Sequence, residues 1–294
     1  MIRRLCAPLI VVATVIAASV VVAGPAHAAG PPRHTPPDLV ALGDSFAAGT
    51  GNTPYSDPAC GRSEKAAYGE RLDQLRLVEL QAFPACGGNT TIQVAGQVGA
   101  ITQETDVVTV QALGNDFFFS TLAGFCLTPQ EDLSCHRNQP LPIGMTVQQL
   151  LDSIQTSGPV LLKALYDRID TQISKVGAKA TVIVVDYGNP FPSPTGRVGP
   201  FCPTMDREEL GVAADFANGL NAAMRTAIAG RSNYVFANVA PRFRGLDICG
   251  YASAFFRPPL PGLPSGTTDP AGYLHPNAVG QGIYAAVLAG RLYS

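Results

Sequence analysis

The chain has 294 residues, of which 46% are hydrophobic and 14% are charged, so it is long and apolar enough to bury a core and is not a disordered chain. Its 20 Lys and Arg residues and 22 Asp and Glu residues give a formal net charge of −2, which excludes the basic surplus of a nucleic-acid-binding protein. The length allows one large domain or two ordinary ones.

The N-terminus has the three parts of a secretory signal. Arg3 and Arg4 precede an uncharged apolar run, and Ala-His-Ala at 26–28 is a small-x-small cleavage site. We therefore expect residues 1–28 to be a signal peptide, the protein to be secreted, and the mature chain to have no membrane span. The alternative is an uncleaved membrane anchor, because the uncharged stretch 5–26 is long enough to cross a bilayer.

Residues 29–37 are rich in proline and predict an extended leader ahead of a single domain at 38–294. Short apolar runs predict strands buried on both faces of a parallel sheet, at 39–42, 107–113, 181–185 and 234–239. Segments with helical spacing lie at 66–80, 147–176, 208–229 and 277–292. This alternation predicts a doubly wound α/β fold with three loop insertions, at 117–144, 188–203 and 241–274.

Ser45 lies at the junction of a predicted strand and a predicted helix. Gly43-Asp44-Ser45 follows the apolar run 39–42, so the hydroxyl projects from the carboxyl end of the strand, where open α/β sheets bind ligands. The Ser45 N–H can donate to an oxyanion, although a serine at this place can also be only a helix cap. The chain has no G-x-S-x-G motif and no P-loop, which excludes the α/β-hydrolase nucleophile elbow and a phosphate loop of that type.

Three histidines follow the predicted signal: His34, His136 and His275. They lack HExxH spacing, so a zinc hydrolase is not expected, and we predict neither a metal nor a cofactor. His34 lies in the leader and His136 lies in a polar insertion, where a solvated surface histidine is usual. His275 precedes Pro276 at the start of the last predicted helix, where it is either a functional base or an exposed residue at a helix N-terminus.

Together these blocks resemble those of the SGNH (GDSL) hydrolase family. Gly43-Asp44-Ser45, Asn115-Asp116 and His275-Pro276-Asn277 occur in the family's order, and the match is closest to its secreted actinobacterial lipase/esterase branch. The loop 85–91, Ala-Cys-Gly-Gly-Asn-Thr-Thr, is similar to the second block and makes Gly88 the matching oxyanion glycine.

The resemblance implies a three-layer α/β/α, flavodoxin-like fold with a central parallel sheet, and it implies a serine esterase or lipase. In such an enzyme Ser45 is the nucleophile and His275 is the base. The oxyanion hole consists of the N–H groups of Ser45 and Gly88 and the side-chain amide of Asn115. Structural roles stay open for Gly88 as a turn glycine and for Asn115 as a cap. Asp44 is expected to order the turn rather than to transfer protons.

Two positions depart from the family pattern. Leu113 occupies the place where the third block usually has glycine, which bears on the local backbone path more than on the role of Asn115. The acid that usually lies three residues before the histidine is replaced by Gly272, and the nearest upstream carboxylate is Asp269. We expect the Gly272 backbone carbonyl to hold the second ring nitrogen of His275, with Asp269 as the alternative.

Apart from Cys6 in the signal, six cysteines remain, and sequence alone permits 15 pairings of six. A metal site is not expected, because the short-spaced cysteine pairs of such sites are absent. The resemblance implies the pairs Cys60–Cys86, Cys126–Cys135 and Cys202–Cys249, each of which joins one loop region to its neighbour.

We therefore expect a secreted, monomeric esterase or lipase that hydrolyses lipids or small acyl esters, with no cofactor and no nucleic-acid partner. The rival enzyme is a carbohydrate O-acetyl esterase on the same scaffold. The rival from another class is a non-catalytic secreted binding protein. The three consecutive aromatic residues at 117–119 can wall an acyl pocket or pack in the core.

Overall fold

A computed structural model of the protein describes residues 35–127, 135–196, 199–202, 205–259 and 266–292. The predicted signal peptide 1–28, most of the predicted leader and His34 lie outside these residues. Residues 36–294 form one compact unit. Within the described ranges, no helix combines the length and the apolarity that crossing a bilayer requires.

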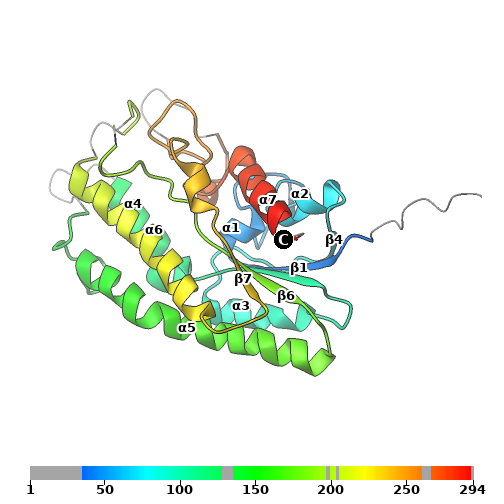
Figure 1. The fold of residues 1–294 in the computed structure, drawn as a ribbon. Helices are drawn as coiled ribbons and strands as arrows, with labels where there is room; N and C mark the ends of the chain where they lie inside the picture. The colour runs from blue at the N-terminus through cyan, green and yellow to red at the C-terminus, as the bar shows by residue number, and fades with distance from the viewer. Residues whose placement is uncertain (1–34, 128–134, 197–198, 203–204, 260–265, 293–294) are drawn as a thin grey trace, which may run out of the picture. The chain divides into compact units, whose positions relative to one another are not determined.

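Five parallel strands form the central sheet in the order β4-β1-β5-β6-β7 (Figure 1). These strands are β1 (Asp38–Gly43), β4 (Glu79–Ala82), β5 (Val107–Gln111), β6 (Thr181–Val185) and β7 (Tyr234–Ala237). All of β5, and all of β1 except its first residue, is buried, because both faces of the sheet are covered. A small antiparallel hairpin pairs β2 (Tyr55–Asp57) with β3 (Arg62–Ser63).

Helices flank the sheet and complete the three layers that the resemblance implies. Figure 1 shows α3 (Thr91–Gln97), α5 (Val147–Val176) and α6 (Arg207–Ile228) on one side, and α2 (Tyr68–Gln74) and α7 (Ala278–Leu292) on the other. Helix α5 packs along α6 and against α3, while α2 packs on α7. The remaining helices are α1 (Ser45–Ala48), α4 (Phe119–Leu127) and the 3-10 helices η1 (Val98–Ala100), η2 (Gly114–Phe117), η3 (Ala240–Phe243) and η4 (Pro270–Gly272). The expected α/β fold is confirmed.

Helices α5 and α6 begin where the sequence supplies a capping box. The Thr146 hydroxyl accepts the N–H of Gln149, whose side chain accepts the N–H of Thr146. Asp206 and Glu209 exchange the same two hydrogen bonds at the start of α6. Gly177 ends α5 with a φ of 75°. These local signals are why the predicted and observed bounds of α5 agree.

Two predicted segments differ from the structure. The range 66–80 contains both a helix and a strand: α2 ends at Gln74, Arg76 takes a φ of 57°, and the chain then continues as the edge strand β4 beside β1. The left-handed residue stops the helix, and the pairing that makes β4 a strand is with a distant segment that local spacing cannot reveal. The predicted insertion 117–144 begins with α4, which is apolar on nearly all sides and so lacks a helical pattern of polar and apolar residues.

The structure contains two of the three predicted disulfides, Cys60–Cys86 and Cys202–Cys249, which close separations of 26 and 47 residues. Cys135 is also disulfide-bonded. The predicted pair Cys126–Cys135 lies outside the described residues, because the side chain of Cys126 does.

Candidate active site

The turn after β1 brings Ser45 to the carboxyl edge of the sheet. Gly43 ends β1 with a φ of 149°, and a Cβ at this position would lie 2.5 Å from the carbonyl oxygen of Gln111. Asp44 then caps α1, since its carboxylate accepts the N–H of Phe46 at 3.0 Å. The turn therefore requires glycine at 43, and it makes Ser45 the first residue of α1.

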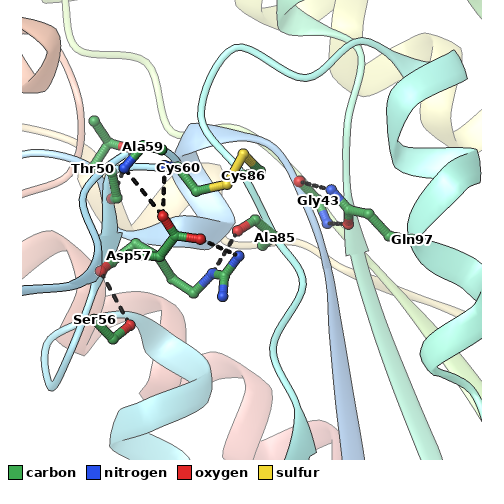
Figure 2. Close-up of a disulfide and its surroundings, with 11 residues drawn as sticks. Gly43, Thr50, Ser56, Asp57, Ala59, Cys60, Ala85, Cys86 and Gln97 are labelled. Carbon is green, nitrogen blue, oxygen red and sulfur yellow. Dashed lines mark hydrogen bonds and ion pairs between the residues drawn. A yellow bond between two sulfur atoms is a disulfide. The ribbon is translucent and has the colours of Figure 1, made fainter.

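A side-chain amide holds the end of β1 in place. Strand β4 pairs with β1 only as far as Val40. Beyond that point the Gln97 carbonyl oxygen accepts the N–H of Gly43 at 2.8 Å, and the Gln97 amide nitrogen donates to the Gly43 carbonyl at 2.9 Å (Figure 2). Gln97 thus takes the place of a neighbouring strand two residues before Ser45.

His275 faces Ser45 from the segment between η4 and α7. Its Nε2 lies 2.7 Å from the Ser45 Oγ. The imidazole is buried, and the centroids of the Phe46 and Phe119 rings lie 5.0 and 6.2 Å from its own. Burial lowers the pKa of His275 from 6.5 to about 4, because it disfavours the charged imidazolium. A neutral imidazole that contacts a serine hydroxyl can act as a general base toward it.

The second ring nitrogen of His275 contacts a different carbonyl from the one expected. Nδ1 lies 3.0 Å from the carbonyl oxygen of Tyr273, whereas the Gly272 carbonyl accepts the main-chain N–H of His275 at 3.0 Å. Gly272 is the last residue of η4 and Leu274 takes a φ of 65°, so the backbone turn uses the Gly272 carbonyl and leaves that of Tyr273 toward the ring. The acceptor of the Nδ1 hydrogen bond is therefore the Tyr273 carbonyl and not the Gly272 carbonyl. The hydrogen bonds of His275 to Tyr273 and Gly272 partly offset the lowering of its pKa by burial.

The alternative orienting residue, Asp269, has other partners. One oxygen of its carboxylate accepts the N–H of Ala271 at 2.9 Å and so caps η4. The other oxygen accepts the phenolic hydroxyl of Tyr55, which itself accepts the N–H of Gly51 at 2.7 Å. Asp269 thus ties the segment that carries His275 to the loop that follows α1, with no hydrogen bond to the imidazole.

The disulfide Cys60–Cys86, which Figure 2 shows, anchors the loop 85–91 two residues before Gly88. Asp57 accepts the N–H of Cys60 at 3.3 Å and forms an ion pair with Arg62 at 3.4 Å. Arg62 also donates from Nε to the carbonyl of Ala85 at 3.0 Å. The hairpin β2–β3 therefore fixes the start of this loop at two successive residues.

Gly88 lies between the ends of β1 and β5. On one side of it, the N–H of Cys86 donates to the Gly43 carbonyl at 3.0 Å; on the other, the side-chain amide of Asn115 donates to the Asn89 carbonyl at 3.0 Å. Gly88 has a φ of 78°, and a Cβ there would meet no atom within 4 Å, so the glycine is needed for its backbone conformation. In the described part of the chain, its N–H has no hydrogen-bond acceptor, and neither has that of Ser45.

Asn115 keeps its place although Leu113 replaces the family's usual glycine. Leu113 takes a φ of 135°, a backbone conformation that favours glycine, and its side chain is completely buried in the core. The Asp116 carboxylate accepts the N–H of Thr91 at 2.9 Å and its hydroxyl at 2.7 Å, which fixes the other side of the turn. Asn115 and Ser45 line the same pocket.

This apolar pocket opens beside Ser45, between α4 and α6. Its empty volume is about 590 Å³, including space open to solvent. The apolar side chains of its wall are Phe46, Phe119, Leu122, Ala123, Pro190, Phe191, Ala213, Phe216, Ala217 and Leu220. The aromatic run at 117–119 is divided: Phe119 lines the pocket, Phe117 is buried in the core, and Phe118 is 43% exposed. The run therefore contributes one residue to the pocket wall and one to the core.

His136 does not take part in this arrangement. Its Nε2 lies 2.6 Å from a carboxylate oxygen of Asp206 at the start of α6, and both side chains are partly exposed. The hydrogen bond to Asp206 raises the pKa of His136. This is the surface histidine that the sequence leads us to expect.

Three residues at the site are not among the site residues predicted from the sequence: Tyr55, Gln97 and Tyr187, the last of which lines the pocket. Tyr187 lies two residues after β6, and its place at the carboxyl end of a predicted strand is the one signal that points to it. Tyr55 and Gln97 carry no such signal, because Asp269 and Gly43, the site residues that they contact, are distant in the chain.

Known proteins resemble this chain over most of its length. The model of the GDSL-like lipase/acylhydrolase family matches residues 41–283. A lipase of Streptomyces rimosus is 28% identical over 257 residues, which cover 85% of this chain and 84% of the relative. The crystal structure of an extracellular lipase from Streptomyces rimosus has a TM-score of 0.70 at 25% identity, covering 86% of this chain and 99% of the other. The crystal structure of phospholipase A1 from Streptomyces albidoflavus NA297 has a TM-score of 0.69 at 25% identity, covering 87% of this chain and 99% of the other.

Proposed function

Because the chain belongs to the GDSL-like lipase/acylhydrolase family, we propose that it hydrolyses acyl esters of lipids with Ser45 as the nucleophile and His275 as the base. The protein is a carboxylic ester hydrolase. The observation that carries the assignment of residues is the 2.7 Å contact between the Ser45 Oγ and the His275 Nε2 beside an apolar pocket.

The reaction begins when the Ser45 hydroxyl attacks the ester carbonyl while the His275 Nε2 takes its proton. The Tyr273 carbonyl accepts Nδ1–H, which keeps Nε2 unprotonated and facing the serine. The negative charge on the tetrahedral oxygen is stabilised by the N–H groups of Ser45 and Gly88 and the side-chain amide of Asn115. His275 then gives the proton to the departing alcohol, and a water molecule hydrolyses the acyl-enzyme by the same steps in reverse.

The apolar pocket between α4 and α6 is the proposed site of the acyl chain. It begins at Ser45, and its wall offers hydrocarbon contact along the length of an alkyl group. An acetyl group would leave most of this wall unused, so the pocket favours a lipid acyl ester over the carbohydrate O-acetyl ester considered as the rival. The lipase and phospholipase A1 names of the relatives agree with this choice.

We also propose that the enzyme is exported and acts as a monomer. The N-terminal signal pattern supports export, as do the two disulfides and the similarity to an extracellular lipase. Mass determination of the secreted protein tests the first proposal, and we expect it to begin at Ala29. Light scattering of the same sample tests the second.

A panel of esters tests the substrate class. The panel comprises chromogenic acetate, butyrate, octanoate and palmitate esters, phosphatidylcholine vesicles and acetylated xylan, each assayed with the wild type and with Ser45→Ala. We expect faster hydrolysis of acyl chains longer than acetate and no hydrolysis by the variant. Cleavage restricted to acetylated xylan would instead assign an O-acetyl esterase, and no cleavage at all would favour a binding protein.

A further inference from the structure

The phenol of Tyr187 bridges the two turns that carry proposed oxyanion donors. Its hydroxyl donates to the carboxylate of Asp44 and accepts the N–H of Gly114 at 3.2 Å. Asp44 immediately precedes Ser45 after β1, and Gly114 immediately precedes Asn115 after β5. One hydroxyl group thus contacts the residue before each donor.

Tyr187 is itself held firmly. Its N–H donates to the Asn221 side-chain oxygen at 2.8 Å, and its carbonyl accepts the Asn221 amide at 2.9 Å, so α6 clamps its backbone from both sides. Its ring lies edge-on to that of Phe46, with centroids 5.0 Å apart and an interplanar angle of 87°. Only 4% of the residue is exposed. A phenol fixed in this way can keep the distance between the two turns that it contacts constant.

We infer that Tyr187 is a positioning residue of the oxyanion hole, which holds the Ser45 N–H and the Asn115 side-chain amide at the spacing that the tetrahedral oxygen requires. The inference rests on the proposed function of these two donors. They follow different strands, and no hydrogen bond in the described part of the chain joins Ser45 to Asn115 directly. Because oxyanion donors act only within a few tenths of an ångström of the developing charge, a rigid link between their turns has a direct effect on the rate.

The substitution Tyr187→Phe removes the hydroxyl and leaves the ring in its packing. The Gly114 N–H and one oxygen of Asp44 then lack a partner in a buried place, and the two turns can drift apart. We expect kcat to fall about tenfold, since a small misplacement of reacting groups is enough for such a loss. KM should stay within about twofold, because Tyr187, which lines the pocket, keeps its ring there and the donors act mainly in the transition state.

The matched control is Tyr234→Phe, which removes one buried tyrosine hydroxyl of β7 whose partner is the Tyr166 carbonyl at 3.1 Å. Tyr187→Phe loses two buried hydrogen bonds and Tyr234→Phe loses one, and a merely structural role of Tyr187 would leave kcat per active site the same in the two variants. Rates are divided by the concentration of active sites titrated with a fluorophosphonate, so that unfolded protein does not lower the measured kcat.

A double-substitution cycle with Asn115→Ala separates positioning from other causes. If Tyr187 acts through the oxyanion donors, Tyr187→Phe should cost less than about threefold in kcat once the Asn115 amide is gone. A tenfold loss in both backgrounds, or a loss equal to that of Tyr234→Phe, would overturn the inference. Full activity of Ser45→Ala would instead overturn the proposed function itself, which keeps the two outcomes apart.

Discussion

Ser45 and His275 are 230 residues apart in the chain, yet their side chains are in hydrogen-bond contact. Two side-chain amides connect the segments on which they lie. Asn52 donates to the carbonyl of Pro276 at 2.9 Å, and Gln281 donates to the carbonyl of Phe46 at 2.9 Å. Both bonds are buried, so direct links between the first and last parts of the described chain support the contact of Ser45 with His275.

The buried state of His275 predicts the acid limb of the pH profile. Since its pKa is lowered from 6.5 to about 4, the imidazole stays neutral and able to accept a proton until the pH falls through about 4. We expect kcat/KM for a soluble ester to lose half its value near pH 4. Circular dichroism at each pH verifies that the fold persists.

Asp44 is a second buried group beside Ser45 whose titration can change the pH profile, because burial raises its pKa to about 7. The variant Asp44→Asn removes its titration and retains a side chain that can cap α1. In this variant we again expect the midpoint near pH 4, and a midpoint near 6.5 would contradict the account of a desolvated His275.

The amide of Asn115 gives a second prediction. Asn115→Ala should lower kcat by about 10² to 10³, the cost of losing one oxyanion donor, with little change in KM. The control is Asn89→Ala, because the Asn89 side chain has no hydrogen bond in the described residues, while its main-chain carbonyl is kept. Equal rates for the two variants would return Asn115 to a capping role.

Asp269 distinguishes a Ser–His dyad from a triad. Its carboxylate caps η4 and accepts the Tyr55 hydroxyl, so Asp269→Asn should loosen the His275 segment only slightly and cost less than about tenfold in kcat. His275→Ala should abolish activity almost completely. A loss near 10⁴ for Asp269→Asn, which is the cost in the well-studied protease triad, would make Asp269 the third member.

At the scale of elements, α6 supplies part of the wall of the proposed acyl pocket. Ala213 and Ala217 lie one turn apart on this helix and contribute small side chains to the pocket wall, to which the larger Phe216 and Leu220 also belong. Small side chains at these positions leave the space that the hydrocarbon would fill. The proposal therefore predicts that this helix face limits the length of the acyl chain.

Filling this space should change the chain-length preference. In the series Ala217→Val, Ala217→Leu and Ala217→Phe, hydrolysis of octanoate esters should fall progressively, by tenfold or more for phenylalanine, while acetate hydrolysis stays within about threefold. Ala222→Phe, on an exposed part of the same helix, is the control. An unchanged ratio of octanoate to acetate hydrolysis across the series would place the acyl chain elsewhere.

Local signals predict the elements that depend on local interactions. Helix α5 has a capping box at one end and a glycine at the other, and β6 is a short apolar run, so the bounds of both follow from the sequence. Strand β4 is different, because it is a strand only by pairing with β1, and the spacing of its residues is compatible with a helix. Helix α4 cannot be recognised from periodicity, because a helix that is apolar on nearly all sides has no polar face to reveal its period.

At the scale of the whole molecule, the site consists of turns that the parallel sheet brings to one edge. The motif residues Ser45, Gly88, Asn115 and His275 can be picked out from the sequence because each follows a strand or precedes a helix in the family's order. The acceptor of the His275 Nδ1 cannot, because the choice between two neighbouring carbonyls depends on the positive φ of Leu274. Residues that link distant turns, such as Tyr187, emerge only from the folded chain.

The most direct test of the account is to label the nucleophile. The secreted protein is treated with a serine-directed fluorophosphonate, and the modified residue is identified by peptide mapping alongside the loss of ester hydrolysis. We predict one label per chain, on Ser45, in proportion to the activity lost, and neither label nor activity in Ser45→Ala. A label on another serine, or ester hydrolysis that survives in Ser45→Ala, would contradict the assignment of Ser45 as the nucleophile.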